Sequence, residues 1–99
     1  MATINKQKIV TVASLAGGAT HSFEWKNPPW DTMLGYFAYP VPPPVKGPHG
    51  AAYASVEITK IECTYVRDNF NGDRKYVTIS VQNTGTVTIG FEVWESWIS

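Results

Sequence analysis

The sequence predicts an all-β protein, and its composition and its hydrophobic alternation carry that prediction. Among 99 residues are ten valines, seven isoleucines, ten threonines and thirteen aromatic residues, against only two leucines. β-Branched and aromatic side chains suit a pleated, half-buried surface, whereas leucine favours helices. Apolar and polar residues also alternate along most segments between the Gly and Pro turn signals. We therefore expect an immunoglobulin-like antiparallel β-sandwich of six to seven strands, with a small closed β-barrel as the alternative.

The expected strands are separated by glycine- and proline-containing turns. They cover about residues 8–15, 20–25, 33–39, 55–68 and 87–97, with a further strand that carries Val77, Ile79 and Val81. One domain of residues 1–99 is expected, since a chain of this length supports one core. The proline-rich stretch at 40–50 is expected to be an extended loop across one end of the sandwich. The alternative is that residues 40–44 form a ligand for an SH3- or WW-type groove.

The long strand at 55–68 contains a one-residue slip in its alternation. Val56 and Ile58 point one way, and the next apolar residues continue the alternation one position out of step. Such a slip is typical of a β-bulge or of a bend between sheets, and we place it at Thr59-Lys60.

The hairpin that follows contains Asn71-Gly72 at its tip. A three-residue loop of Phe70, Asn71 and Gly72 would give Gly72 a left-handed backbone. It would also place three apolar residues of one strand opposite three of the next, namely Tyr65 opposite Val77, Cys63 opposite Ile79 and Ile61 opposite Val81. In this register Cys63, the only cysteine, is a buried side chain rather than a reactive thiol.

Residues 77–86 read Val-Thr-Ile-Ser-Val-Gln-Asn-Thr-Gly-Thr, and Gly90-Phe91-Glu92-Val93 follow. This stretch resembles the Val-x-Asn-x-Gly turn of bacterial immunoglobulin-like sandwich modules, among them the cell-adhesion-related (CARDB-type) domains. The resemblance covers about 30 residues. It implies a non-enzymatic sandwich used in adhesion or binding, and it implies no catalytic residue.

Charge and motif content argue against several classes of function. Eight basic and eight acidic residues give a net charge of zero, so nucleic acid is not an expected partner. No run approaches the ~20 apolar residues that span a bilayer, so membrane insertion is not expected. Residues 1–8 lack the apolar core of a secretory signal, which leaves the compartment open.

Catalytic, metal-binding and cofactor-binding motifs are not apparent either. No Gly-x-Ser-x-Gly elbow is present, and the two histidines and one cysteine lack zinc-site spacing. Residues 68–73 superficially resemble a calcium loop. However, Phe70 and Gly72 occupy positions where oxygen ligands are needed, so a plain hairpin tip is favoured. We expect no catalytic residue, no metal and no cofactor.

Aromatic residues outside the expected core form the candidate binding site. Trp25 shares a face with Phe23 and is expected in the core. Trp30 lies in a proline-bounded loop, and Trp94 falls on the polar face of its strand beside Glu92. An exposed ring can stack on the apolar face of a sugar while a carboxylate accepts hydroxyl protons. The candidate ligand-binding residues are Trp30, Asp31, Tyr39, His49, Glu92 and Trp94.

The sequence therefore favours a binding module over an enzyme. The first hypothesis is recognition of a glycan or a cell surface through exposed aromatic rings. The alternative is a protein-interaction or self-assembling component, such as a homo-oligomer, which would use the same rings. A small enzyme is the remote alternative.

Overall fold

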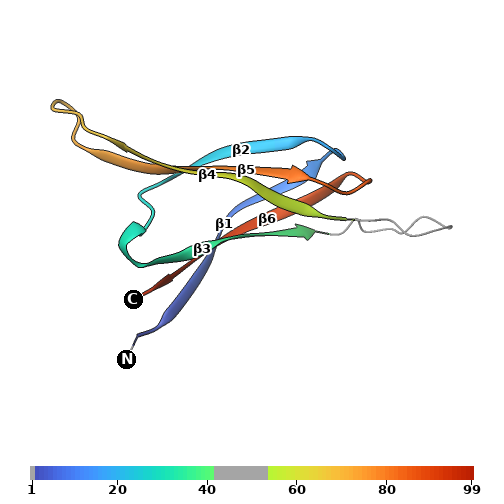
Figure 1. Cartoon of the computed structure of the whole chain (residues 1–99), viewed down its shortest axis with the longest axis horizontal. Coiled ribbons are helices and arrows are strands. Elements are labelled where there is room, and N and C mark those ends of the chain that lie inside the picture. The colour runs from blue at the N-terminus through green and yellow to red at the C-terminus, as the bar shows by residue number, and fades with distance from the viewer. Residues whose placement is uncertain (1, 42–53) are drawn as a thin grey trace.

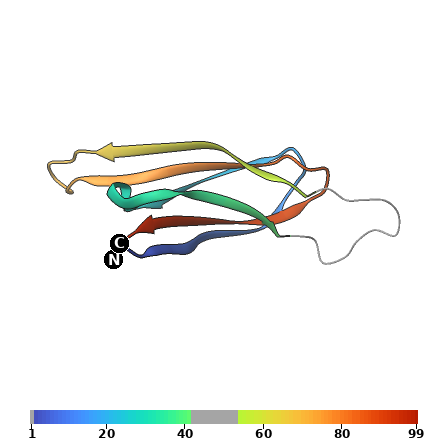
Figure 2. The ribbon, with the colours of Figure 1, turned by 60° about the horizontal axis from the view of Figure 1, so that its bottom comes forward.

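Six strands pair into two three-stranded antiparallel sheets that pack face to face as a β-sandwich (Figures 1 and 2). The structure is a computed structural model that describes residues 2–41 and 54–99. One sheet has the order β1–β6–β3 and the other β2–β5–β4. The strands in the described residues are β1 (Ile4–Leu15), β2 (Thr20–Lys26), β3 (Met33–Val41), β4 (Val56–Val66), β5 (Arg74–Asn83) and β6 (Ile89–Ile98), and a 3₁₀ turn, η1 (Trp30–Thr32), precedes β3. The all-β sandwich is confirmed, and the described strands form two separate sheets rather than a closed barrel.

The core lies between the two central strands, β5 and β6. Fully buried side chains come from β5 (Val77, Ile79 and Val81) and from β6 (Phe91 and Val93). Each of these strands is flanked by two others, so its inner-facing residues are shielded on both sides as well as from above. Phe23 and Trp25 of β2 pack against this cluster, as expected from their shared face. Full burial of one such aliphatic side chain contributes about 1.5–3 kcal/mol.

The predicted bulge in the long strand is confirmed, but the predicted hairpin register is wrong. The β4–β5 pairing shifts between Ile58 and Lys60. Beyond the bulge, Ile61 lies opposite Ile79, and Cys63 lies opposite Val77. Each β4 residue therefore faces a position two residues earlier in β5 than predicted.

The reason for the register error is a longer loop, over residues 67–73. The carboxylate of Asp68 accepts hydrogen bonds from the backbone N–H of Phe70 (2.9 Å) and of Asn71 (3.0 Å). These N–H donors, that of Phe70 first, lower the pKa of Asp68. Gly72 donates its N–H to the carbonyl of Asp68 and has a φ of +83°, which confirms the predicted left-handed glycine.

Burial of Cys63 was also predicted, and the structure shows it exposed. Cys63 does lie on the inner face of its sheet, because cross-strand partners share a face and Val77 is a core residue. The two sheets, however, diverge toward the β4–β5 hairpin (Figure 1). Ile61 and Tyr65, on the same face, remain 50% and 56% exposed. The alternation identified the face correctly, but this part of the face is not covered by the second sheet.

Asn83 joins the two turns that connect the sheets at the opposite end. Its side chain is fully buried and donates to the carbonyls of Leu15 (2.9 Å) and Val87 (2.8 Å), while its Oδ1 accepts from the N–H of Gly85 (2.9 Å). Its backbone N–H and carbonyl bond to Ala19 and Gly18 of the β1–β2 turn. Every polar group of this buried residue is therefore paired.

Replacing Asn83 by Ala is expected to lower the free energy of unfolding by about 2–4 kcal/mol, because two buried carbonyls and one N–H lose their partner. Asn83→Asp should cost at least as much, since a carboxylate would face the two carbonyl oxygens. Urea unfolding followed by tryptophan fluorescence measures both. The neighbouring Gln82→Ala is the control, because Gln82 makes one long side-chain bond of 3.4 Å to Gly18. If Gln82→Ala and Asn83→Ala lowered the free energy of unfolding equally, the result would contradict the role of Asn83.

The left-handed backbone of Gly72 generates a second prediction. Gly72→Val should destabilise the fold by about 1–2 kcal/mol, because a β-branched residue resists a positive φ. Gly72→Asn should cost less. Apart from Gly72 and its two chain neighbours, no residue has an atom within 4 Å of the position that a Cβ would take, so the difference in stability between the two variants would report backbone strain alone. Thermal unfolding of the two variants is the measurement, and indistinguishable melting temperatures would count against the left-handed turn.

Candidate functional site

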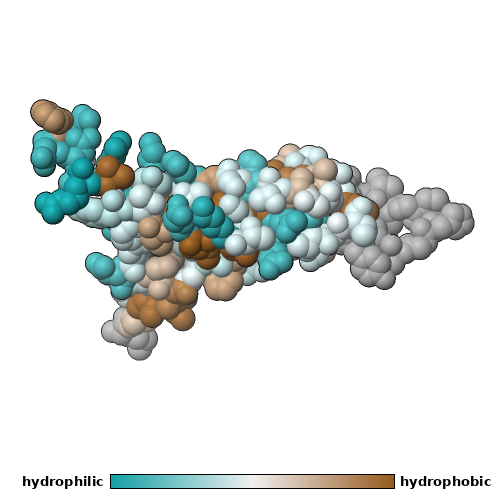
Figure 3. Space-filling model, turned by 45° about the horizontal axis from the view of Figure 1, so that its top comes forward, coloured by the Kyte–Doolittle hydropathy of each residue, from teal (hydrophilic) through white to brown (hydrophobic). Residues whose placement is uncertain are grey.

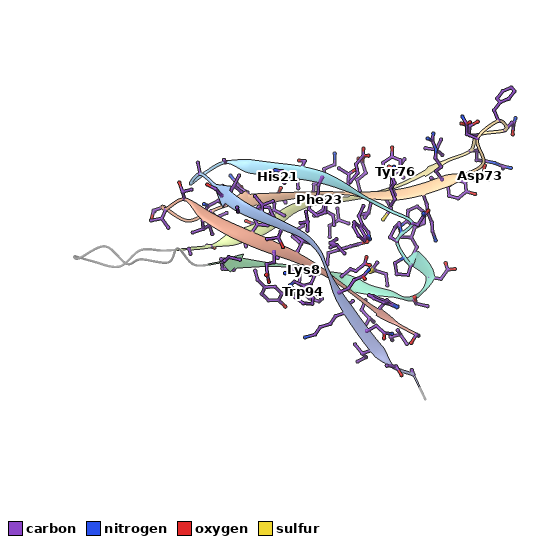
Figure 4. The ribbon with its side chains drawn as sticks, turned by 180° about the vertical axis from the view of Figure 1, so that it is seen from behind. Lys8, His21, Phe23, Asp73, Tyr76 and Trp94 are labelled. Carbon is purple, nitrogen blue, oxygen red and sulfur yellow. The ribbon has the colours of Figure 1, made fainter. Side chains whose placement is uncertain are left out.

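Three aromatic rings lie together on the outer side of the β1–β6–β3 sheet. Phe37 of β3 is directly opposite Trp94 of β6, and Tyr39 is opposite Glu92. Phe37 and Tyr39 are about half exposed, and Trp94 is partly buried. Figure 4 shows Trp94 and Lys8 on the side of this sheet that faces away from β2, whereas Phe23 points toward the space between the sheets. The rings come from adjacent strands because alternate residues of each strand point to the same side.

Charged groups surround the central ring of this set. The indole Nε1–H of Trp94 donates to Oε1 of Glu92 at 3.2 Å, and Lys8 Nζ donates to Oε2 of the same carboxylate at 3.4 Å. Lys6 Nζ lies 5.8 Å from the centroid of the Trp94 ring, within cation–π range. We call this surface the aromatic face, and it consists of Lys6, Lys8, Phe37, Tyr39, Glu92 and Trp94.

A shallow hollow of about 330 Å³ opens on the aromatic face, lined by Lys6, Phe37, Tyr39, Trp94, Glu95 and Ser96. Residue 35, two positions before Phe37 on β3, is a glycine, and the Phe37 ring lies over it, with its Cζ 3.6 Å from the position that a Cβ would take. The hollow combines apolar ring surface with an ammonium group. Glu92, at its border, adds a carboxylate that Trp94 and Lys8 hold in place. This combination can bind a flat ligand that carries hydroxyl groups.

The structure brings together three of the six residues predicted from the sequence, Tyr39, Glu92 and Trp94. Trp30 and Asp31 lie elsewhere, in η1. Lys75 Nζ of the other sheet lies 5.5 Å from the Trp30 ring centroid, and the indole Nε1 of Trp30 is buried without a partner. Trp30 therefore does not belong to the aromatic face. His49 lies outside the described residues.

Sequence reasoning missed Phe37, Lys6 and Lys8. Phe37 could have been found, because it is two residues from Tyr39 in the same expected strand and so shares its face. The two lysines could not, because their approach to Trp94 depends on β1 pairing with β6, which are far apart in the sequence.

A polar group is buried between the sheets at their diverging end. Glu95 is 2% exposed and accepts a hydrogen bond from Gln7 Nε2, while its Oε2 has no partner. Tyr36 lies opposite Glu95 on β3, and burial, reinforced by the charge of Glu95, raises the pKa of this tyrosine well above its usual range. The neutral Tyr36 and the buried Glu95 therefore lie between the two sheets, near the point where the sheets begin to diverge.

A second hollow, of about 490 Å³, lies on the β2–β5–β4 sheet. It is lined mainly by charged and polar residues, with one ring, Tyr76. A single ring among mixed charges offers less stacking surface than the aromatic face.

Within residues 2–41 and 54–99, no group of three or more His, Cys, Asp or Glu side chains could hold a metal ion. In the same part of the chain, no helix is long and apolar enough to cross a membrane.

Comparisons of the chain with protein-family models, with curated proteins and with solved structures found no match.

The position of Trp94 generates a stability prediction. Trp94→Ala should lower the free energy of unfolding by only about 1 kcal/mol, because the ring lies outside the core. Trp25→Ala, the matched control, should cost about 3–5 kcal/mol, since its ring packs against the buried cluster. Chemical denaturation compares the two variants. Loss of folding in Trp94→Ala would identify this ring as a structural element.

Proposed function

We propose that this protein is a non-enzymatic carbohydrate-binding module and that the aromatic face is its binding surface. The observation that carries the proposal is the set of three rings, Phe37, Tyr39 and Trp94, on adjacent strands of one exposed sheet face. Aromatic rings offer large, rigid contact area with little conformational entropy to lose. The C–H groups on one side of a pyranose ring are apolar and can stack on such a surface.

The polar groups of the aromatic face would fix the orientation of the sugar. Glu92 can accept hydrogen bonds from vicinal hydroxyls, and Lys6 and Lys8 can donate to ring or hydroxyl oxygens. The bond from the Trp94 indole to Glu92 holds both groups in place before binding, which reduces the entropy lost on association. Two lysines and one carboxylate favour neutral or acidic sugars over amino sugars with a free ammonium group.

A protein partner is the alternative, since exposed aromatic residues also anchor protein interfaces. The distinguishing feature is the carboxylate of Glu92 beside the Trp94 ring. The indole of Trp94 already donates to Glu92 and holds this carboxylate in place. A carboxylate held in this way suits a ligand whose hydroxyl groups donate hydrogen bonds to it.

A glycan array with the full chain, followed by calorimetric titration of the sugars it retains, tests the proposal. Trp94→Ala should weaken binding at least about tenfold, because a central stacking ring carries a large share of the energy. Phe70→Ala is the matched control, because Phe70 is a 97% exposed aromatic residue at the hairpin tip, outside the aromatic face. It should leave affinity unchanged.

Two results would overturn the proposal. One is sugar binding that Trp94→Ala does not weaken. The other is an array without bound sugars, combined with a protein ligand whose capture depends on Trp94.

A further inference from the structure

The free side of strand β4 combines two features that rarely remain exposed together. Among the described residues, β4 pairs with β5 alone, so its other side presents unpaired backbone N–H and C=O groups. Its inner-facing residues Ile61, Cys63 and Tyr65 are all exposed as well. An edge strand with exposed apolar side chains is a template for pairing with another strand. Figure 3 shows apolar patches at the base of the hydrophilic β4–β5 end and across the middle of the molecule.

The other edge strand of this sheet differs from β4. The inner-facing residues of β2, among them Phe23 and Trp25, pack against the core. Within the β2–β5–β4 sheet, the exposed apolar row is therefore confined to β4, and it begins after the bulge at Ile58/Lys60.

The regular part of β4 is complementary to itself. From Lys60 to Val66 the strand pairs without interruption, and its central residue is Cys63. If two copies pair antiparallel about Cys63, Ile61 of one copy lies opposite Tyr65 of the second copy, and the two Cys63 side chains meet at the axis. All three exposed apolar side chains then face apolar partners on the same side of a continuous sheet.

Charges on the opposite side of the strand permit this register. Lys60 and Glu62 already form an ion pair with each other at 3.4 Å in one copy. In the paired arrangement, Glu62 lies opposite Thr64 of the second copy, whose hydroxyl can donate to it. No like charges lie directly opposite each other, and the two Glu62 carboxylates meet only diagonally, each beside its own Lys60.

We propose that this protein forms a symmetric dimer through β4, which joins the two β2–β5–β4 sheets into one six-stranded antiparallel sheet with its two-fold axis at Cys63. The partner is a second copy of the chain, because the apolar row and the register complement themselves. The interface is independent of the aromatic face, which lies on the other sheet. An interface made by one short strand from each copy buries little surface area, so the dimer is weak and its population depends on protein concentration.

Sedimentation velocity of the full chain over a concentration series tests the dimer. A monomer–dimer equilibrium is expected, and Ile61→Lys should raise the dissociation constant at least about tenfold, since it places two ammonium groups in the apolar row. Ile4→Lys is the matched control, because Ile4 is an exposed isoleucine on a different edge strand. It should leave the equilibrium unchanged. Circular dichroism of both variants shows that they are folded.

Oxidation with diamide tests the register. Paired antiparallel residues have Cα atoms about 4.5–5.5 Å apart, within the range that a disulfide bridges. Two Cys63 thiols should therefore join, and diamide takes up the two protons and two electrons released. The folded chain should cross-link far faster than the same chain in urea. A Cys63→Ser/Phe70→Cys double variant, with its thiol at the hairpin tip, should cross-link no faster folded than unfolded.

Either of two results would overturn the proposal. The first is a folded chain that stays monomeric at millimolar concentration. The second is a dimer that Ile61→Lys does not weaken and that diamide does not trap through Cys63.

Discussion

The sandwich depends on the buried amide of Asn83. The β1–β2 and β5–β6 connections each cross from one sheet to the other, and Asn83 holds both of them with its side-chain and backbone groups. These bonds fix the position at which the chain leaves β5 in one sheet and enters β6 in the other. Because that crossing is held in place, Ile79 of one sheet and Phe91 of the other belong to the same buried cluster. At the opposite end no comparable tie is seen among the described residues, and there the sheets diverge.

The fold class, most strand positions and the bulge could be predicted because they depend on local sequence. Alternation shows which residues of a strand share a face, and Gly72 shows where the chain needs a positive φ. Alternation does not show whether a face is covered. Ile61 and Cys63 repeat the pattern of core residues but lie where the second sheet has diverged, so their exposure depends on tertiary geometry. The hairpin register failed for a related reason, since the side-chain bonds of Asp68 lengthen the loop.

The candidate site could be predicted only in part. Trp94 and Glu92 are two residues apart on one strand, so their shared face follows from the sequence. Tyr39 joins them because β3 pairs with β6, a long-range pairing that periodicity does not reveal. Trp30 shows the limit of arguing from a loop position, because its ring lies beside Lys75 of the other sheet and not on the aromatic face.

The position of the two chain ends has a mechanical consequence. Thr3 and Ser99 exchange backbone hydrogen bonds, of 3.1 and 3.0 Å, at the open end of the antiparallel β1–β6 ladder. Figure 2 shows the start of β1 beside the end of β6. A force that pulls these two residues apart therefore acts perpendicular to β1 and β6, and it breaks the hydrogen bonds between the two strands one after another. A tether attached at both ends would peel β1 from β6 at low force, whereas a load applied along the strands would meet all the bonds at once.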